Sequence, residues 1–375
     1  MQQDFSFWEF ETYSREWDIC IIGSGITGLS TGISLLEKNP QLQILVVDRW
    51  FIPLGASTRN AGFSCFGSPS EILHDIRKMG EETAVSLISK RWNGLLKLRA
   101  RINTEYARYE THGGYEMYHP NGFEEVADQL DYLNQLLESV TSHKNVYRVV
   151  AVPEGIRGFS HAVFNPLEGQ LHPAYMMEDL KKKYLSLGGN LCTGFPIDII
   201  EDHQDHVKLV NPLAFPIIAR KVVVTTNAFA AQLLPQLDVH GARNNVLVTS
   251  PLPGLAWKGC FHFDRGFYYF RNIGNRILLG GARNRDIENE NTEQFGFNPV
   301  IVDTLQQFLY DHLAEKNQCH IEYQWSGIIG IGDIKMPIIK AISPRLFVGV
   351  RLSGIGIALA SLIGDELTEL VLQQE

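Results

Sequence analysis

The chain has 375 residues, of which 45% are hydrophobic and 20% charged, and its formal net charge is −9 at pH 7. This length allows two domains that share an interface, and the composition is ordinary for a soluble globular protein. The acidic balance argues against a nucleic-acid partner, because phosphate binding needs clustered Lys and Arg, and against a basic membrane-docking face.

The cysteines and the apolar pattern indicate in which cellular compartment the protein is expected. The five cysteines include no C-x-x-C pair, which indicates buried thiols in a reducing compartment. The first 16 residues contain several acids and no apolar core, which argues against a signal peptide. Arg345 and Arg351 interrupt the longest apolar stretch near the C-terminus, so we expect no membrane span. We therefore expect a cytoplasmic protein, whose oligomeric state stays open.

The first predicted elements lie between Trp17 and Arg49. Asp18 to Ile22 is a short apolar run typical of a buried strand, and the six residues after it, Gly23 to Gly28, fit G-x-G-x-x-G. Apolar residues at spacings of three and four then predict a helix, and Gln43 to Val47 predicts a second buried strand. Strand, glycine turn, helix and strand are the context that a dinucleotide-binding motif requires.

Each glycine of the motif has a physical role. Gly23 permits the tight turn, Gly25 lets the backbone approach a pyrophosphate, and Gly28 lets helix and strand pack closely. The helix begins near Ile26 and Thr27, where unpaired N–H groups and the positive end of the helix dipole favour phosphate.

An acid follows the second strand. Asp48 lies 20 residues after Gly28 (48 minus 28), where it would accept hydrogen bonds from ribose hydroxyls. Arg49 could indicate a 2′-phosphate, but Asp48 argues against one, and an exposed charge is an alternative for Arg49.

The rest of the chain alternates between two patterns. A stretch rich in small residues, from Arg49 to Phe63, leaves the second strand where the pyrophosphate and ring system of a cofactor would lie, and an ordinary surface loop is the alternative. Helices are predicted at 80–110, 123–140, 174–187, 298–315 and 357–373, strands at 197–200, 207–210, 221–227 and 346–350, and a hairpin at 266–281. The strand at 221–227 is continuously apolar and is predicted to return, in parallel, to the first sheet.

One turn contains residue types that can bind a metal. The turn from His203 to His206 contains two histidines and an acid, but no further ligand stands at metal-site spacing, so we expect a solvated hairpin tip and no metal.

The nucleotide fold is interrupted twice. Residues 1–79, 155–238 and 322–375 are predicted to form a Rossmann-like α/β domain. Residues 80–154 and 239–321 are predicted to form an α+β substrate domain with an antiparallel sheet.

The chain resembles the FAD-dependent oxidoreductases of the D-amino acid oxidase, glycine oxidase and sarcosine oxidase group, near the γ-glutamylputrescine oxidase branch. The motifs that carry the resemblance span nearly the whole chain: G-S-G-I-T-G with Asp48, G-A-S-T-R-N-A-G, V-V-V-T-T-N-A, Y-Y-F-R…N-R-I-L-L-G-G, W-S-G and S-G-I-G. The resemblance implies a GR2-type FAD-binding domain and oxidation of a C–N bond by hydride transfer to flavin, giving an imine. It also implies a small amine or amino acid as the substrate.

The chain departs from the family pattern at three places. Members with covalent flavin use an early-loop His or a C-terminal Cys, whereas Asn60 stands in the loop and no Cys lies beyond Cys319, so we expect noncovalent FAD. Amino-acid oxidases place a carboxylate-binding Arg shortly after W-x-G, where this chain has Ile328 and Ile329. The usual Gly-His-Gly near the C-terminus reads Gly354-Ile355-Gly356.

The resemblance and the motifs together predict the site. The predicted cofactor-binding residues are Gly23, Gly25, Ile26, Thr27, Gly28, Asp48, Arg49, Ser57, Thr58, Arg59, Asn60, Ala61, Gly62, Thr226, Asn227, Gly327, Arg351, Ser353, Gly354, Ile355 and Gly356. The predicted substrate-side residues are Tyr268, Tyr269, Arg271 and Arg351. Strand alternation puts Tyr269 and Arg271 on one face and Tyr268 on the other. Aromatic packing is the alternative role for both tyrosines, and a surface salt bridge is the alternative for Arg271. Arg351 follows an apolar strand, where burial requires an anionic partner.

Three functions stay open at this point. The first is an FAD-dependent oxidase or dehydrogenase of an amine or amino acid. The second is a dehydrogenase of a 2-hydroxy acid or of glycerol phosphate, and the third is a non-catalytic flavoprotein subunit. The missing arginine after Trp325 keeps the third one open.

Overall fold

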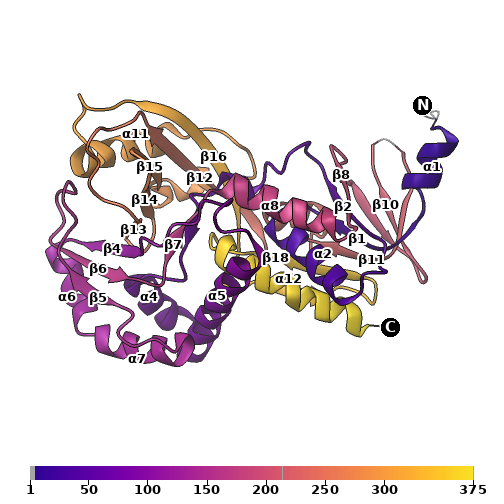
Figure 1. The fold of residues 1–375 in the computed structure, drawn as a ribbon, viewed down its shortest axis with the longest axis horizontal. Coiled ribbons are helices and arrows are strands. Elements are labelled where there is room, and N and C mark those ends of the chain that lie inside the picture. Colours follow the sequence, from indigo (N-terminus) through magenta and orange to yellow (C-terminus); the bar gives the residue numbers. More distant parts are fainter. Residues whose placement is uncertain (1–4, 213, 375) are drawn as a thin grey trace.

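The structure is a computed structural model that describes residues 5–212 and 214–374. Two eight-stranded sheets organise these residues, and Figure 1 shows them toward opposite ends of the long axis. We call the one that contains β1 the first sheet and the one that contains β14 the second sheet. The mixture of parallel and antiparallel strands confirms the predicted fold class.

The first sheet has a parallel centre. Its strands, in spatial order, are β17 (Ile338–Ala341), β18 (Leu346–Val350), β11 (Ile217–Val224), β1 (Glu16–Ile22), β2 (Ile44–Asp48) and β8 (Asn190–Thr193). A hairpin of β9 (Ile199–Asp202) and β10 (Val207–Val210) pairs with β11. β11 runs parallel to both β1 and β18, which confirms the predicted returning strand. Its last three residues are fully buried, which is why the run is continuously apolar.

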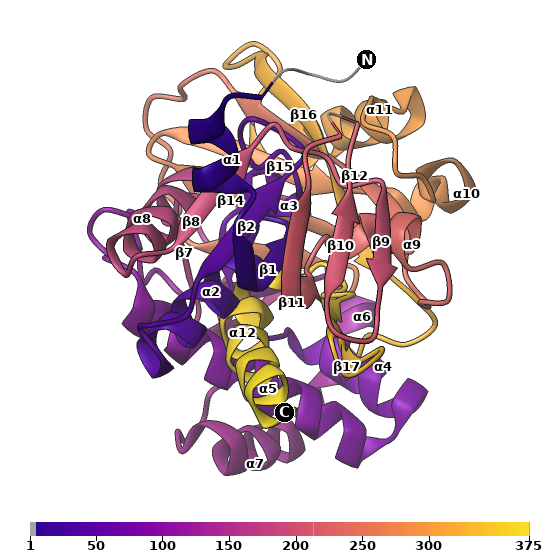
Figure 2. The ribbon, with the colours of Figure 1, turned by 90° about the vertical axis from the view of Figure 1, so that its right-hand side faces the viewer.

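Helices cover one face of the first sheet. α2 (Ile26–Lys38) packs against α12 (Gly356–Gln373), and Figure 2 shows the two helices side by side near the sheet. Their close approach depends on Gly364, where a Cβ would lie 2.7 Å from the Cβ of Ser30. α8 (Pro173–Ser186) and α5 (Glu81–Arg101) also contribute to this core.

The second sheet is almost entirely antiparallel. Its strands, in spatial order, are β16 (Ile321–Ile331), β12 (His240–Thr249), β15 (Arg276–Gly281), β14 (Tyr268–Ile273), β13 (Cys260–Phe263), β4 (Gly114–Tyr118), β6 (His161–Asn165) and β5 (Arg148–Val150). β14 and β15 form the predicted hairpin. Two short strands, β3 (Phe63–Ser64) and β7 (Gly169–Gln170), pair separately.

Three predicted helices are shorter than expected. The helix expected at 80–110 is α5, which ends at Arg101. The helix expected at 123–140 is two helices, α6 (Pro120–Ala127) and α7 (Leu130–Thr141), and the one expected at 298–315 is α11 (Pro299–Phe308) followed by the π-helical turn η3 (Leu309–Leu313). The remaining elements are α1 (Phe7–Tyr13), α3 (Ala56–Arg59), α4 (Pro69–Met79), η1 (Asn227–Phe229), α9 (Ala230–Leu233), η2 (Arg283–Arg285) and α10 (Ile287–Glu290).

The strand pairing in the two sheets can be compared with the predicted division of the chain into two domains. Strands of the first sheet all come from 1–79, 155–238 and 322–375. β6 and β16 come from the same segments but pair in the second sheet, so strand pairing crosses the predicted boundaries at these two places. Both are long-range pairings that periodicity along the chain cannot reveal.

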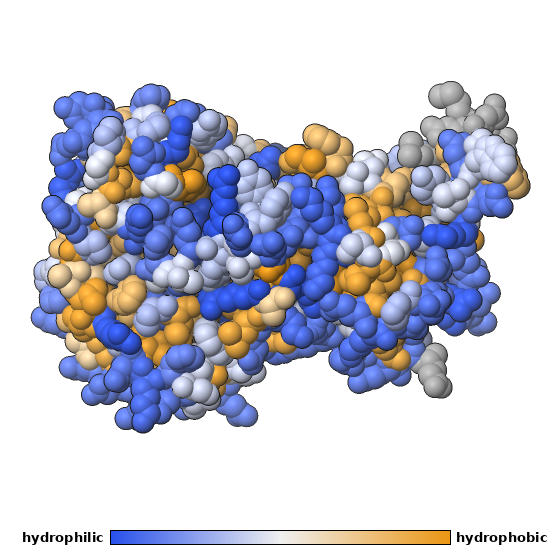
Figure 3. Space-filling model, viewed as in Figure 1, coloured by the Kyte–Doolittle hydropathy of each residue, from blue (hydrophilic) through white to orange (hydrophobic). Residues whose placement is uncertain are grey.

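Hydrophilic side chains cover most of the face drawn in Figure 3, and hydrophobic ones appear there in separate patches. Within the described part of the chain, no helix combines the length and the apolar character that crossing a membrane requires.

Candidate functional site

A cavity of about 600 Å³ lies where the two sheets meet. One end is lined by the turn after β1, the start of α2 and the end of β2. This end therefore lies at the carboxyl ends of the parallel strands β1 and β2. The other end is lined by side chains of the second sheet and by the turn before α12. We call residues Gly23–Gly28 the glycine turn, residues Arg351–Gly356 the C-terminal turn, and Phe63, Val246, His262, Phe267, Tyr269 and Arg283 the sheet wall.

The glycine turn is held by close backbone contacts. A Cβ on Gly28 would lie 1.9 Å from the carbonyl oxygen of Gly23, and Gly23 itself has φ +106°. A Cβ on Gly25 would lie 2.8 Å from the Ser57 hydroxyl oxygen, which accepts the Ile26 N–H at 3.0 Å. Gly23, Gly25, Ile26 and Thr27 line the cavity, and Gly28 supports the turn from behind.

Asp48 stabilises the glycine turn and also reaches the cavity. Its carboxylate accepts the Ser24 N–H at 2.8 Å, the Ser24 hydroxyl at 2.7 Å and the Trp50 N–H at 3.1 Å. A carboxylate has roughly four acceptor positions, so one stays available for a ribose hydroxyl. The neighbouring Arg49 lies over the Trp50 and Phe229 rings, each at 4.0 Å, and donates to Gln232 at 3.1 Å. Arg49 therefore also lines the cavity and is not a freely exposed charge.

The loop after β2 is shaped by Asn60. Its side-chain amide donates to the carbonyls of Ala56 and Ser57, both at 2.9 Å, and its oxygen accepts the Gly62 N–H at 2.8 Å. Ser57, Arg59, Asn60 and Ala61 line the cavity, whereas Thr58 and Gly62 do not. Thr58 bonds the Pro53 carbonyl instead, and a Cβ on Gly62 would meet the Leu171 carbonyl at 2.2 Å.

Arg59 and Gly327 join this loop to the second sheet. Arg59 donates to the Ser326 carbonyl at 2.8 Å, and its guanidinium lies 4.5 Å from the Phe295 ring centroid. The Trp325 indole donates to the Arg59 carbonyl at 2.9 Å. The W-S-G motif thus holds the loop against β16, and Gly327 lines the cavity.

Asn227 positions the C-terminal turn. Its side-chain oxygen accepts the Arg351 N–H at 3.1 Å and the Leu352 N–H at 3.2 Å. Thr226, Asn227, Ser353, Gly354, Ile355 and Gly356 all line the cavity. The hydroxyl oxygens of Thr226 and Ser353 are buried and have no hydrogen-bond partner in 5–212 and 214–374. Because buried polar groups are normally paired, these two suit a polar ligand such as FAD.

The expectation that Arg351 contacts flavin or substrate needs correction. Its guanidinium donates to the Met336 carbonyl at 2.9 Å and the Asp238 carbonyl at 3.0 Å, and it pairs with the Asp238 carboxylate. Arg351 does not line the cavity. The burial that the sequence indicated is real, with 6% of the residue exposed, but the required anion is Asp238.

The hairpin residues divide as strand alternation predicts, but only one of them reaches the cavity. Tyr268 stacks on Phe308 with ring centroids 4.8 Å apart, which is its alternative role in core packing. Tyr269 lines the cavity beside Phe63. Arg271 is 5% exposed and lies behind Gly62, so the predicted substrate contact is not available to it. Burial lowers the pKa of the Arg271 guanidinium, which has no hydrogen-bond partner in the described ranges.

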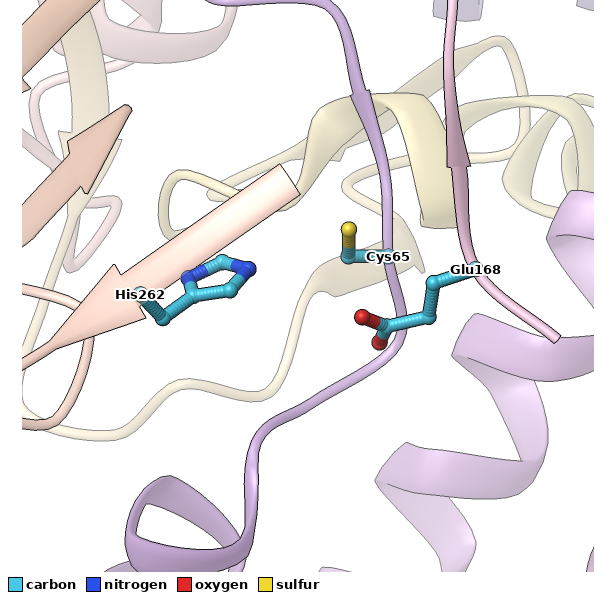
Figure 4. A group of neighbouring side chains, drawn as sticks. All are labelled: Cys65, Glu168 and His262. Atoms are coloured by element: carbon cyan, nitrogen blue, oxygen red, sulfur yellow. The ribbon is translucent and has the colours of Figure 1, made fainter. Parts of the chain in front are cut away.

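Sequence reasoning missed a cluster of Cys65, Glu168 and His262 next to the sheet wall (Figure 4). One ligand atom of each lies within 4.8 Å of the others. Burial raises the pKa of Glu168 to about 7 and lowers that of His262 to about 4. Sulfur, nitrogen and oxygen suit zinc, but Arg271 is close enough to interact electrostatically with Cys65, which disfavours a second cation. The expectation of no metal stays a prediction.

A second missed group is a charge network on the cavity wall. Lys335 lies 3.1 Å from the Glu71 carboxylate and 2.8 Å from that of Asp75, and Arg91 lies 3.3 Å from Glu71. Burial alone would raise the pKa of Glu71, but Lys335 and Arg91 outweigh it and bring that pKa to about 2. These residues lie on α4, α5 and the loop before β17, so no local spacing could have indicated the network.

Comparison with known proteins agrees with this geometry. Residues 18–370 match the family described as DAO, FAD dependent oxidoreductase. The chain is 25% identical to the probable oxidoreductase OrdL of Haemophilus influenzae, with 99% of this chain and 86% of that protein covered. It is 24% identical to gamma-glutamylputrescine oxidoreductase of Escherichia coli, with 94% and 83% covered.

Solved structures show the same fold. Glycine oxidase from Geobacillus kaustophilus superposes with a TM-score of 0.75 at 20% identity, covering 97% of this chain and 96% of that one. L-proline dehydrogenase from P. horikoshii superposes with a TM-score of 0.77 at 13% identity, covering 96% and 94%. With the family match over nearly its whole length, the chain belongs to the DAO family of FAD-dependent oxidoreductases.

Proposed function

We propose that this enzyme binds FAD noncovalently and oxidises the C–N bond of a small amine or amino acid to an imine. The observation that carries the proposal is one continuous cavity that joins the glycine turn to the sheet wall. A dinucleotide extending from the glycine turn would present its ring system to the compartment that the sheet wall lines. The names of the relatives support an amine or amino acid, since they include glycine oxidase, gamma-glutamylputrescine oxidoreductase and iminodiacetate oxidase.

The cofactor would be held by backbone and polar groups along the first sheet. The N–H groups of the glycine turn would bind the pyrophosphate, and Asp48 would accept from the ribose. Ser57, Asn60 and Ala61 would lie along the cofactor, with Thr226, Ser353 and the C-terminal turn on the other side. We assign cofactor binding to 1–79, 155–238 and 322–375 and substrate binding to 80–154 and 239–321, with β6 and β16 completing the second sheet.

The second sheet would supply the substrate compartment. FAD would accept the hydride that leaves the carbon next to the amine nitrogen. The Phe63 and Tyr269 rings both line the cavity, with centroids 5.8 Å apart, and would exclude water from that carbon. His262 also lines the compartment. Its pKa of about 4 keeps the ring neutral at pH 7, so it can accept a hydrogen bond from the substrate N–H.

Substrate bleaching tests the reaction class. The purified protein would be mixed anaerobically with a panel of primary amines, secondary amines, amino acids and 2-hydroxy acids, and flavin absorbance would be followed. We expect bleaching by at least one amine or amino acid and by no hydroxy acid. Bleaching by hydroxy acids alone, or by no member of any class, contradicts the proposed reaction.

Acid precipitation tests the mode of attachment. Asn60 occupies the loop position of the covalent histidine, and its side chain is committed to Ala56, Ser57 and Gly62. We therefore expect the yellow colour to appear in the supernatant. Colour that stays with the precipitate would show a covalent bond.

A further inference from the structure

The cavity lacks a carboxylate-binding arginine after the W-S-G motif, as the sequence indicates. Ile328 and Ile329 stand after W-S-G, and both line the cavity with apolar side chains. Arg351 is paired with Asp238, and Arg271 lies behind Gly62. A substrate carboxylate would therefore need a different cation on the cavity wall.

Arg283 is the cation that the sheet wall offers. It follows β15 directly, after Ala282, whose φ of +58° turns the chain at the end of the strand. Arg283 lines the cavity together with Phe267 and Tyr269, and it is half-buried. Within residues 5–212 and 214–374 its side chain has no ion pair and no hydrogen bond, and the one charge that acts on it is that of Glu290.

The acid that interacts with Arg283 already has other partners. Glu290 interacts with it electrostatically, yet the Glu290 carboxylate lies 2.7 Å from Arg243 and accepts from Asn245 and Asn298 at 3.1 and 3.0 Å. The charge of Glu290 is thus already compensated. Burial lowers the pKa of the Arg283 guanidinium, which agrees with a cation that lacks its own anion.

The other cations around the cavity are engaged differently. Lys335 is held by Glu71 and Asp75, and Arg265 lies 3.7 Å from Asp264. Arg49 and Arg59 belong to the cofactor side, where each lies over aromatic rings. Arg283 therefore differs from the other substrate-side cations in having a half-buried, uncompensated charge that lines the cavity.

We propose that Arg283 forms a carboxylate-binding site at the sheet wall, so that the substrate is an amine that also carries a carboxylate. The inference rests on the proposed function and sharpens its substrate class. The guanidinium would bind the carboxylate through paired N–H donors, and Tyr269 and Phe267 would pack along the connecting chain. A partly desolvated carboxylate–arginine pair discriminates strongly against neutral analogues, because the neutral analogue leaves the arginine without a counterion.

The test compares matched anionic and neutral probes on the FAD-bound protein. Benzoate and 4-phenylbutyrate, each with its amide, would be titrated into the parent protein and into Arg283→Leu, Arg283→Lys and Arg265→Leu. Binding would be read by flavin difference spectra and, independently, by calorimetry. We expect Arg283→Leu to weaken at least one carboxylate roughly ten- to a hundredfold, with little change for its amide. Arg283→Lys should retain part of the affinity, and Arg265→Leu should behave like the parent.

The outcomes separate this inference from the proposed function. If neither carboxylate binds the parent better than its amide, or if Arg283→Leu binds both equally well, the carboxylate site does not exist. If Arg283→Leu loses FAD instead, Arg283 serves the cofactor and the inference is overturned. A parent protein that contains no flavin overturns the proposed function, whereas the calorimetric comparison of benzoate with benzamide still decides the role of Arg283.

Discussion

The glycine-turn end of the cavity and the sheet wall differ in how far apart in the chain their parts lie. The glycine turn, its helix and Asp48 come from one stretch of 26 residues, Gly23 through Asp48, and are held by close backbone contacts and by the Asp48 carboxylate. The sheet wall brings Phe63, Val246, His262, Tyr269 and Arg283 together from four strands and a loop. The glycine-turn end depends on residues that must be small. The sheet wall depends on which charged side chains have an ion-pair partner and which have none.

Gly28→Ala should have the largest effect, because it breaks the end that depends on small residues. The added Cβ would lie 1.9 Å from the Gly23 carbonyl, which is backbone and cannot rotate away. We expect loss of FAD and of most soluble protein, measured by flavin content and yield. Gly55→Ala is the matched control, because nothing lies within 4 Å of its Cβ position. Equal flavin content in both variants would show that the turn relaxes easily.

Glu168→Gln should change the pH dependence of stability on the sheet side. The folded-state pKa of Glu168 is raised to about 7 from 4.5, so the folded protein keeps this proton between those values while the unfolded chain loses it. This contribution to stability is present below pH 4.5 and is lost as the pH rises through 7. Between pH 5 and pH 8 the parent should therefore lose about 2–3 kcal/mol more unfolding free energy than Glu168→Gln.

Chemical unfolding at pH 5 and pH 8 measures this difference. Glu154→Gln serves as the control, since Glu154 is exposed and the same charge is removed. Parallel pH profiles for the parent and Glu168→Gln would show that the Glu168 carboxyl ionises normally.

Asp48→Ala should affect both FAD affinity and folding. Loss of charge-assisted hydrogen bonds to the ribose should weaken FAD roughly ten- to a hundredfold. The Ser24 N–H would also lose its partner, at a cost of about 1–3 kcal/mol in unfolding free energy. Asp48→Asn keeps one acceptor oxygen, so it should restore much of the stability and little of the FAD affinity. Flavin titration and chemical unfolding measure the two effects, and unchanged affinity in both variants would place the ribose elsewhere.

The same difference between the two ends explains what could be predicted from the sequence. The strand, turn, helix and acid follow from local periodicity and from glycine sterics, and the structure has them at β1, α2 and β2. Alternation along β14 correctly put Tyr268 and Tyr269 on opposite faces. Local patterns predict these features because the features depend on residues that are close together in the sequence.

Long-range pairing could not be predicted in the same way. Arg351 was correctly expected to be buried with an anion, but Asp238 is 113 residues away and nothing local indicates it. His262 and Lys335 face the cavity only because β13 and the loop before β17 meet there. Burial of a charge is thus predictable from its apolar neighbours in the chain, whereas its partner depends on the tertiary fold.

Lys335→Met should have the smallest effect, and it tests the charge balance of the sheet side. The substitution leaves Glu71 and Asp75 with Arg91 alone, so the pKa of Glu71 should rise from about 2. Lys335 is 31% exposed at its side chain, and solvent screens the pair, so the loss of unfolding free energy at pH 7 should be about 1 kcal/mol or less. Stability that depends on ionised Glu71 is present above pH 4.5 and is lost as the pH falls, and in Lys335→Met this loss should be smaller.

Ligand charge gives the second measurement on Lys335→Met. With one cation removed from the cavity wall, benzylamine should bind more tightly than to the parent, and benzamide should bind equally to both, because only the amine carries a charge. Lys340→Met is the matched control, since Lys340 is exposed on β17 and does not line the cavity. If Lys335→Met and Lys340→Met give the same benzylamine affinity, Lys335 does not set the charge of the substrate compartment.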